Sequence, residues 1–257
     1  MLQLRSVQFN IPTQYKNTYP YNLPVLQQVK EIEFTKSVTI LVGDNGTGKS
    51  TLLNMLAASG DMITIGDNKT NSIWSDDLIR TIKLTWNLKT KTGFYFKAND
   101  FIQFIEQTKE TKREARQAIQ EIQTNNMDSL ATMPHARTLH DLEQFYGEGL
   151  EFRSHGESFL DLFRARFRPN GLYLLDEPEA PLSPLNQLAL ISLMKENVQT
   201  GAQFILATHS PMLMAFPNAE ILLLEKDHLT KVSYEELEHV NLTRDFLNNS
   251  QSFLRHL

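Results

Sequence analysis

The sequence predicts an α/β fold in which helices flank a mainly parallel sheet, with an antiparallel β-region at the N-terminus and a short helical insertion. Two observations carry this prediction. Short apolar runs, the length of strands buried on both faces, alternate along the chain with longer segments of helical spacing. In addition, a glycine-rich loop joins one such strand to the helix that follows it. Regular alternation of strand and helix is typical of a parallel sheet covered by helices.

The chain begins with β-like sequence. Residues 2–10 and 25–34 alternate or are rich in apolar and aromatic residues, so we expect strands of a small β-region there. A loop rich in Pro and Asn, TQYKNTYPYNLP, lies between them. Residues 38–42 (VTILV) form a short, mainly apolar run ended by glycine, which predicts a strand buried on both faces.

The middle of the chain mixes both patterns. After Lys49, the segment STLLNMLAA has helical spacing and good helix formers. Residues 81–86 and 94–96 are β-like, and residues 99–146 have helical spacing. We therefore predict one domain spanning residues 1–257, with a helical subdomain at about residues 99–150.

The last third continues the alternation. A helical pattern, ESFLDLFRARF, precedes an apolar strand at residues 172–175, and two more strands are predicted at residues 204–207 and 221–224. Ser183 followed by proline predicts a helix start, and Gly201 is well placed to end that helix. Its expected apolar stripe consists of Leu185, Leu188, Ile191 and Met194.

Composition excludes several classes of protein. The chain has 257 residues and no cysteine, which excludes disulfide frameworks, thiolate metal sites and cysteine nucleophiles, and fits a cytoplasmic setting. A net charge of -5 excludes a strongly basic coat for nucleic acid, although not a local basic groove. The N-terminus lacks the pattern of a signal peptide, and no apolar run approaches the ~20 residues of a membrane helix. Any membrane role would need a separate membrane-embedded partner.

The strongest chemical signal is a phosphate-binding loop, G-x-x-x-x-G-K-[ST]. Glycines let the backbone curl so that its N–H groups face phosphate oxygens, and the following helix N-terminus favours the anion. Lys49 would reach the β- and γ-phosphates, and Ser50 would hold Mg²⁺. The alternative, a glycine-rich turn with an exposed Lys and Ser, does not explain the flanking strand and helix. The expected nucleotide-binding residues here are Gly43, Asp44, Asn45, Gly46, Thr47, Gly48, Lys49, Ser50 and Thr51.

Two further signals follow predicted strands. Asp176 and Glu177 end the strand LYLL at the edge where α/β sheets bind ligands. Asp176 could hold Mg²⁺, and Glu177 could orient or deprotonate an attacking water. By themselves two carboxylates could equally cap a helix. His209 follows the strand at 204–207 and could contact a γ-phosphate, although an isolated histidine is more often structural.

The order of these motifs resembles that of ATP-binding-cassette (ABC) ATPases, within the P-loop NTPase fold. Asp176-Glu177-Pro178-Glu179 resembles the Walker B motif of that family, and Ala180–Ser183 lies at its D-loop position. Ser154-His155-Gly156-Glu157 lies where the ABC signature S-G-G-Q belongs. The segments SHGESF, LYLLDEPEA and ATHSP are similar to the corresponding segments of soluble ABC-type ATPases that are grouped as AAA-family ATPases. Those are relatives of the chromosome-maintenance and recombination-repair branch, and similar ATPases occur in bacterial defence.

The chain departs from the family pattern at several positions. Arg153 replaces a leucine, His155 a glycine and Glu157 a glutamine, and no clear Q-loop glutamine is present. By resemblance, Asn99 is the weak candidate for the Q-loop position. These departures are unlike a typical transporter motor.

The resemblance implies a cofactor, a partner and roles. ATP with Mg²⁺ would be sandwiched between two cassettes, with Ser154, Gly156 and Glu157 of one protomer completing the site of the other. Because the sequence contains one cassette, we expect an ATP-dependent homodimer. Glu177, His209 and Lys49 would be the catalytic residues, and Ser50 and Asp176 the metal ligands.

Three weaker features leave alternatives open. Tyr15, Tyr19 or Tyr21 could stack on adenine, with Tyr19 or Tyr21 favoured, or could pack within the loop. His135 and His140 are five apart, so one helix face cannot easily present both, and we predict no zinc site. A basic group could track nucleic-acid phosphates, but interleaved acids favour pairing on a solvated helix face instead. This group consists of Lys109, Lys112, Arg113 and Arg116.

The expected function is Mg²⁺-dependent ATP hydrolysis that drives a dimer switch acting on DNA or an effector protein, in repair or anti-phage defence. Two alternatives are the motor subunit of a membrane transporter and a nucleotide-dependent scaffold without catalysis. A small-molecule kinase would explain the phosphate-binding loop but would leave Ser154–Glu157 and His209 without a role.

Overall fold

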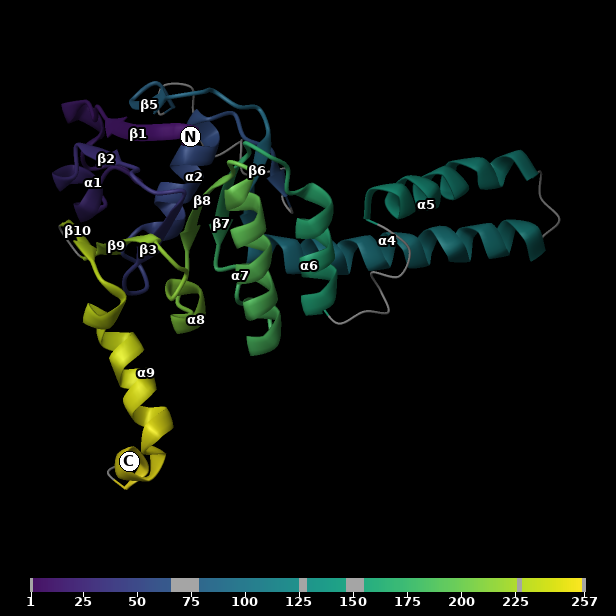
Figure 1. Ribbon diagram of the computed structural model, residues 1–257. Helices are drawn as coiled ribbons and strands as arrows, with labels where there is room; N and C mark the ends of the chain where they lie inside the picture. Colours follow the sequence, from purple (N-terminus) through teal and green to yellow (C-terminus); the bar gives the residue numbers. More distant parts are fainter. Residues whose placement is uncertain (1, 66–78, 125–128, 147–154, 226–227, 256–257) are drawn as a thin grey trace.

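A seven-stranded sheet forms the centre of the computed structural model, which describes residues 2–65, 79–124, 129–146, 155–225 and 228–255 (Figure 1). The strand order is β10-β9-β3-β8-β7-β6-β4, and every pair is parallel except β10–β9 at one edge. The mainly parallel α/β sheet that the sequence predicts is thus confirmed. The strands are β3 (Val38–Val42), β4 (Thr64–Ile65), β6 (Gly93–Lys97), β7 (Leu172–Asp176), β8 (Gln203–Ala207), β9 (Glu220–Leu224) and β10 (Leu229–Val232).

A second, antiparallel sheet lies at the N-terminus, as the sequence predicts. It has the order β2-β1-β5, with β1 at Leu4–Phe9, β2 at Glu31–Glu33 and β5 at Ile82–Trp86. The buried Gln203 side chain of β8 ties it to the central sheet. Its Oε1 accepts from the main-chain N–H groups of Gln3 and Leu4 at 3.0 and 2.8 Å, and its Nε2 donates to Leu4 O at 3.0 Å.

The expected strand over residues 25–34 is wrong in its first half. Residues Pro24–Gln28 form helix α1, and only Glu31–Glu33 is a strand. Pro24 occupies the first helical turn, where its fixed φ favours a helix and its missing N–H costs nothing. Val25 and Leu26 are buried on this helix, and a short apolar run does not by itself distinguish a buried helical turn from a strand.

Helices cover both faces of the central sheet (Figure 1). On one face lie α1, α2 and the antiparallel sheet, which share a core with Leu41, Tyr95 and Leu174 of the central strands. On the other face lie α6, α7 and α8, which pack against residues such as Ile40 and Leu206. The bounds of the helices are α1 (Pro24–Gln28), α2 (Lys49–Ser59), α4 (Ala98–Thr124), α5 (Met133–Tyr146), α6 (His155–Arg166), α7 (Pro184–Gln199), α8 (Pro211–Met214), α9 (Glu238–Asn248) and α10 (Ser250–Leu254), with short 3₁₀ turns at Thr13–Tyr15, Ser129–Thr132 and Tyr234–Glu236.

An aromatic cluster fixes α6 on the sheet. Phe159 and Phe163, one helical turn apart, are fully buried and meet Phe96 of β6 edge-on, with ring centroids 4.5 and 5.0 Å away. Phe167 continues the row beyond the helix and packs on Tyr173 of β7 at 4.6 Å. This packing sets where the first turn of α6 lies relative to the ends of the strands.

The start and end of α7 are as predicted, but its buried face is not. Ser183 caps the helix by accepting from Asn186 N, and Gly201 follows the end with φ of 89°. Leu185 is 75% exposed, whereas Leu190 and Met194 are buried. Residues three apart fall short of the 3.6-residue turn by about 60° each time, so a stripe of period three drifts half-way around the helix over nine residues. The predicted stripe therefore begins in solvent and reaches the core at Met194.

Two helical extensions leave the body of the molecule (Figure 1). Helices α4 and α5 pack side by side and project from one end of the sheet. Helix α9 leaves the body at a different place from α4 and α5. Leu237 and Val240 at its start are buried in the core, and Leu247 near its end is exposed. Within the described part of the chain, none of the helices is long and apolar enough to cross a membrane.

Candidate functional site

The phosphate-binding loop joins β3 to α2, and its glycines adopt backbone angles that other residues rarely adopt. Gly43, Gly46 and Gly48 have φ angles of 152°, 83° and 101°. A Cβ on Gly43 would lie 2.2 Å from the carbonyl oxygen of Leu224, so only glycine fits between the loop and β9. Gly48 stands at the N-cap of α2 in a left-handed conformation, which turns the chain from the loop into the helix.

Lys49 is folded back across this loop. Its Nζ donates to the main-chain oxygens of Gly43 and Asp44 at 2.7 and 3.0 Å. Burial lowers the pKa of Lys49, while nearby carboxylates, with Glu177 and Asp176 foremost, act in the opposite direction. The ammonium group is therefore held at the mouth of the loop by two neutral acceptors that phosphate oxygens could replace.

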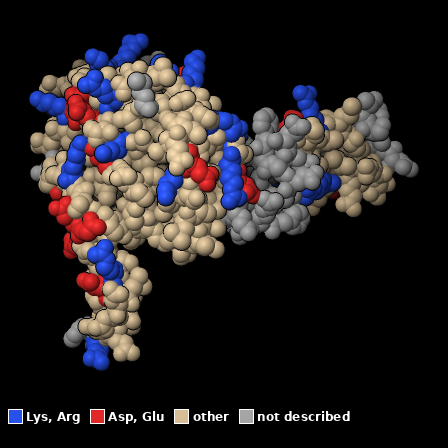
Figure 2. All heavy atoms as spheres, viewed as in Figure 1, with Lys and Arg blue, Asp and Glu red and all other residues tan. Residues whose placement is uncertain are grey.

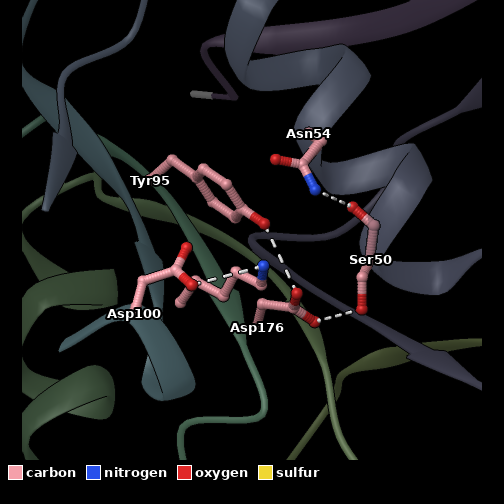
Figure 3. A network of polar contacts seen from close by, with 6 residues as sticks. Ser50, Asn54, Tyr95, Asp100 and Asp176 are labelled. Atoms are coloured by element: carbon pink, nitrogen blue, oxygen red, sulfur yellow. Dashed lines mark hydrogen bonds and ion pairs between the residues drawn. The ribbon is translucent and has the colours of Figure 1, made fainter. Parts of the chain in front are cut away.

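Ser50 and Asp176 meet across the site, although they come from α2 and β7 (Figure 3). Ser50 Oγ donates to Asp176 Oδ1 at 3.0 Å, and the Tyr95 hydroxyl donates to Asp176 Oδ2 at 3.3 Å. The side-chain amide of Asn54 donates to Ser50 O at 2.8 Å one turn along α2. The structure thus brings together the hydroxyl and the carboxylate that the sequence predicts as metal ligands.

The Asp176 carboxyl is an unusual acid. It is 2% exposed, and burial raises its pKa from 3.8 to about 6, although the Ser50 hydrogen bond partly offsets this effect and Glu177 adds to it. A buried carboxylate beside a serine hydroxyl is an oxygen donor set that suits Mg²⁺. A cation there would compensate the charge that burial otherwise penalises. The residues present therefore fit a Mg²⁺ site held by Ser50 and Asp176.

Glu177 and His209 lie at the ends of neighbouring strands. Glu177 has a φ of 49° and donates its main-chain N–H to Ala207 O at 2.9 Å. Such a left-handed conformation is costly for a residue with a side chain, and it marks the sharp turn that follows β7. His209, two residues beyond β8, is exposed, and its main-chain N–H donates to Glu179 Oε1 at 2.6 Å.

Sequence reasoning missed Tyr95, Lys97 and Asp100. Tyr95 and Lys97 lie two apart on β6, and Lys97 is paired with Asp176 of β7. Lys97 Nζ forms an ion pair with Asp100 Oδ1 at 3.4 Å, and its charge lowers the pKa of Asp176 (Figure 3). The signal was present as a Tyr and a Lys at period-two spacing in an otherwise apolar strand, but only the strand order shows that this strand adjoins β7.

The structure describes only some of the residues at the ABC signature position. Ser154 and Arg153 lie outside the described residues, whereas His155, Gly156 and Glu157 form the first turn of α6. Asn99 is exposed in the first turn of α4. The roles of these residues stay predictions.

The three tyrosines of the N-terminal loop separate into different environments. Tyr21 is fully buried, its hydroxyl contacts Thr81 Oγ1, and its ring lies 6.2 Å from that of Tyr15. Tyr21 is therefore part of the core, which favours packing within the loop over stacking on adenine for this residue. Tyr19 is 58% exposed, and its hydroxyl lies 3.1 Å from Thr51 Oγ1, next to the phosphate-binding loop.

The basic group on α4 does not form a free surface. Lys112 is 2% exposed, and Arg113 forms an ion pair with Glu110 one turn away. Both findings favour the alternative of paired charges over a continuous track for phosphates. No cluster of three His, Asp or Glu side chains suited to a metal ion occurs among the described residues.

Known proteins resemble this chain in sequence and in structure. A family described as "ABC transporter" matches residues 29–180, more than half of the chain, and one described as "AAA domain, putative AbiEii toxin, Type IV TA system" matches residues 149–215. A protein of Methanosarcina acetivorans named "Putative ABC transporter ATP-binding protein" is 26% identical over 198 residues, which is 73% of this chain and 68% of that protein.

Solved structures resemble it at lower sequence identity. The structure of cbiO1 from Clostridium perfringens, described as part of the ABC transporter complex cbiONQ, is 14% identical, with 99% of this chain and 100% of that one covered and a TM-score of 0.49. The SMC head domain from Thermotoga maritima is 16% identical, with 90% and 99% covered and a TM-score of 0.42.

Proposed function

Because the chain belongs to the ABC transporter family of ATPases, we propose that it binds ATP with Mg²⁺ and hydrolyses it to ADP and phosphate. The observation that carries this proposal is the meeting of Ser50 Oγ and Asp176 Oδ1 beside the phosphate-binding loop, with Glu177 next in the chain. Membership implies nucleotide hydrolysis in general. The retained carboxylates and lysine support catalysis by this member.

Each residue of the site has a chemical task in this mechanism. Lys49 exchanges its main-chain acceptors for oxygens of the β- and γ-phosphates, and the N–H groups of the loop hold the same oxygens. Bound Mg²⁺ would neutralise charge on the β- and γ-phosphates. Glu177 orients the attacking water and accepts its proton, and His209 contacts the γ-phosphate.

We further propose an ATP-dependent homodimer. In it, Ser154 acts together with Gly156 and Glu157, which lie in the first turn of α6, to complete the site of the partner protomer. Support comes from the row of buried phenylalanines, which holds the first turn of α6 in a defined place on the sheet. ATP would join two such surfaces by charge-assisted hydrogen bonds, and hydrolysis would remove them.

Light scattering on a sizing column tests the homodimer, and a phosphate-release assay tests hydrolysis, both with Glu177→Gln. This change keeps the shape of the side chain and removes the charge that accepts a proton. We expect ATP binding without turnover and a shift from monomer to dimer only when Mg²⁺–ATP is present. Lys49→Ala is the control, since it should bind no ATP and stay monomeric. An unchanged mass with bound ATP would exclude the homodimer, and unchanged turnover would exclude the role of Glu177.

For the work done with ATP, we propose a switch that acts on DNA or on an effector protein, in repair or anti-phage defence. Support comes from the match of residues 149–215 to the AAA-domain family and from the projecting helices α4 and α5. On the face shown in Figure 2, basic and acidic side chains are interspersed. Stimulation of ATP hydrolysis by DNA would support action on DNA. If no nucleic acid changes the rate of hydrolysis, action on DNA is excluded and an effector protein is the remaining target.

A transporter subunit is the second candidate, and the name of the Methanosarcina relative favours it. This candidate predicts that the protein sediments with membranes when a membrane-embedded partner is co-expressed. A scaffold without catalysis instead predicts that turnover by the wild type does not exceed that of Glu177→Gln.

A further inference from the structure

We propose that Glu179 is a positioning residue that holds His209 at the γ-phosphate, and this inference rests on the proposed function. Glu179 comes from the turn after β7, whereas His209 follows β8. Glu179 Oε1 accepts the main-chain N–H of His209 at 2.6 Å, and the two residues are 30 positions apart. A carboxylate acceptor makes this a charge-assisted hydrogen bond, which is stronger than a bond between neutral groups.

The bond extends the connection between two strands beyond the end of their ladder. The last paired residues of β7 and β8 are Asp176 and Ala207, and the last main-chain bond runs from Glu177 N to Ala207 O at 2.9 Å. After this point the chain turns sharply at Glu177, so main-chain pairing stops. The Glu179 side chain therefore takes over where the sheet can no longer fix the position of His209.

A second contact holds the same segment from the other side. Thr208 N donates to Leu41 O of β3 at 3.3 Å, and the fully buried Thr208 accepts Ser210 N through its Oγ1 at 3.0 Å. The His209 main chain is thus fixed between β3 and the turn after β7. Its side chain is exposed, and the fixed main chain sets the point from which that side chain extends.

The other carboxylate oxygen of Glu179 supports a role beyond packing. Oε2 is buried and has no hydrogen-bond partner among the described residues. Burying a charged oxygen without a hydrogen-bond partner is costly. The same carboxylate lies close enough to Lys49 to favour its charged form. Glu179 therefore links the end of β8 electrostatically to the phosphate-binding loop.

A mutant cycle separates this role from simple stabilisation. Glu179→Ala removes the acceptor, Glu179→Gln keeps an oxygen that can accept the same N–H, and Glu196→Ala on the exposed surface of α7 controls for the loss of one negative charge. We expect Glu179→Ala to lower kcat at least about fivefold with little change in KM, and Glu179→Gln to recover most of that loss. In a protein that already carries His209→Ala, adding Glu179→Ala should lower kcat by less than about twofold further.

Two results would overturn the proposal. One is an equal loss from Glu179→Ala with and without His209, which would mean that the two residues act independently. The other is a Glu179→Gln variant as impaired as Glu179→Ala, since the hydrogen bond would then not be the cause.

Amide hydrogen exchange of His209, followed by NMR, gives a readout that does not need turnover. Exchange should become faster in Glu179→Ala and stay slow in Glu179→Gln and Glu196→Ala, and unchanged exchange in Glu179→Ala would contradict the positioning role. A wild type that binds ATP without hydrolysing it would overturn the proposed hydrolysis instead. In that case the same set of Glu179 and His209 variants is compared by ATP affinity instead of kcat.

Discussion

Ser50 and Asp176 lie 126 residues apart in the chain, and a hydrogen bond of 3.0 Å joins Ser50 Oγ to Asp176 Oδ1. The bond connects the first turn of α2 with the end of β7. It keeps an oxygen pair in place at the cost of burying a carboxylate. Stability and the proposed Mg²⁺-binding role therefore oppose each other at Asp176, and this opposition leads to the first two predictions.

Asp176→Asn should stabilise the nucleotide-free protein while abolishing Mg²⁺-dependent hydrolysis. A pKa raised from 3.8 to about 6 corresponds to a cost of roughly 3 kcal/mol for the ionised form at neutral pH. The amide loses one of the two accepted hydrogen bonds, which leaves an expected gain of roughly 1–2 kcal/mol. Urea unfolding measures this gain in stability, with Asp245→Asn on the exposed surface of α9 as the control. A less stable Asp176→Asn variant would contradict the prediction.

The same pKa gives stability and ligand binding opposite dependences on pH. Because folding raises the pKa of Asp176, its contribution to stability is fully present below about pH 4 and is lost as pH rises through about 6. Mg²⁺–ATP needs the ionised carboxylate, so affinity should fall as pH falls below about 6. The lowered pKa of His239, caused mainly by burial, instead removes stability as pH falls. Melting temperature and ATP affinity are measured across pH for the wild type and for Asp176→Asn, and the difference between the two proteins gives the contribution of Asp176. Identical pH profiles in the two proteins would rule out titration of Asp176.

Two glycines of the phosphate-binding loop should differ sharply in tolerance. Gly43→Ala places a methyl group 2.2 Å from Leu224 O, so we expect a loss above about 3 kcal/mol in unfolding free energy. Gly46→Ala meets no heavy atom within 4 Å and pays only for its positive φ, roughly 1–2 kcal/mol. Denaturant unfolding gives the loss of unfolding free energy in each variant, and the difference between the two losses reports the steric contact beyond backbone strain. Equal losses would mean that contact with β9 is unimportant.

Tyr19 should affect nucleotide binding and Tyr21 should affect folding. If Tyr19 stacks on adenine, Tyr19→Ala should weaken ATP binding about tenfold, and Tyr19→Phe, which keeps the ring, should not. Tyr21→Ala removes a fully buried ring and should cost roughly 3–5 kcal/mol of stability. Calorimetric titration with ATP and thermal unfolding separate the two effects. Normal ATP affinity in Tyr19→Ala would exclude stacking by this residue.

Helix α7 offers a test of which face is buried. Leu190→Ala should cost roughly 2–5 kcal/mol because its side chain is fully buried between the helix and the sheet. Leu185→Ala should change stability by less than about 0.5 kcal/mol because its side chain is 75% exposed. Chemical denaturation of both variants is sufficient. A large effect of Leu185→Ala on its own would show that this face is covered in solution.

Local pattern was informative wherever both faces of an element are buried. Val38–Val42 and Leu172–Leu175 are mainly apolar because helices cover the sheet on both sides, and such runs are typical of buried strands. The same rule failed over residues 25–34, because a short apolar run does not distinguish a helix from a strand. The apolar stripe predicted on α7 is also wrong in part, because residues spaced three apart do not stay on one face of a helix.

The sequence alone determined which residues the proposed chemistry would use, because motif residues adjacent in the chain, such as Lys49 with Ser50 and Asp176 with Glu177, have fixed spacing whatever the rest of the fold. Tertiary structure decided which distant residues join them. Tyr95 and Lys97 reach Asp176 because β6 adjoins β7, and Glu179 reaches His209 because β7 adjoins β8. Strand order depends on the packing of the whole core, and no local pattern encodes it. The buried state of Asp176, and with it the raised pKa, follows from that packing as well.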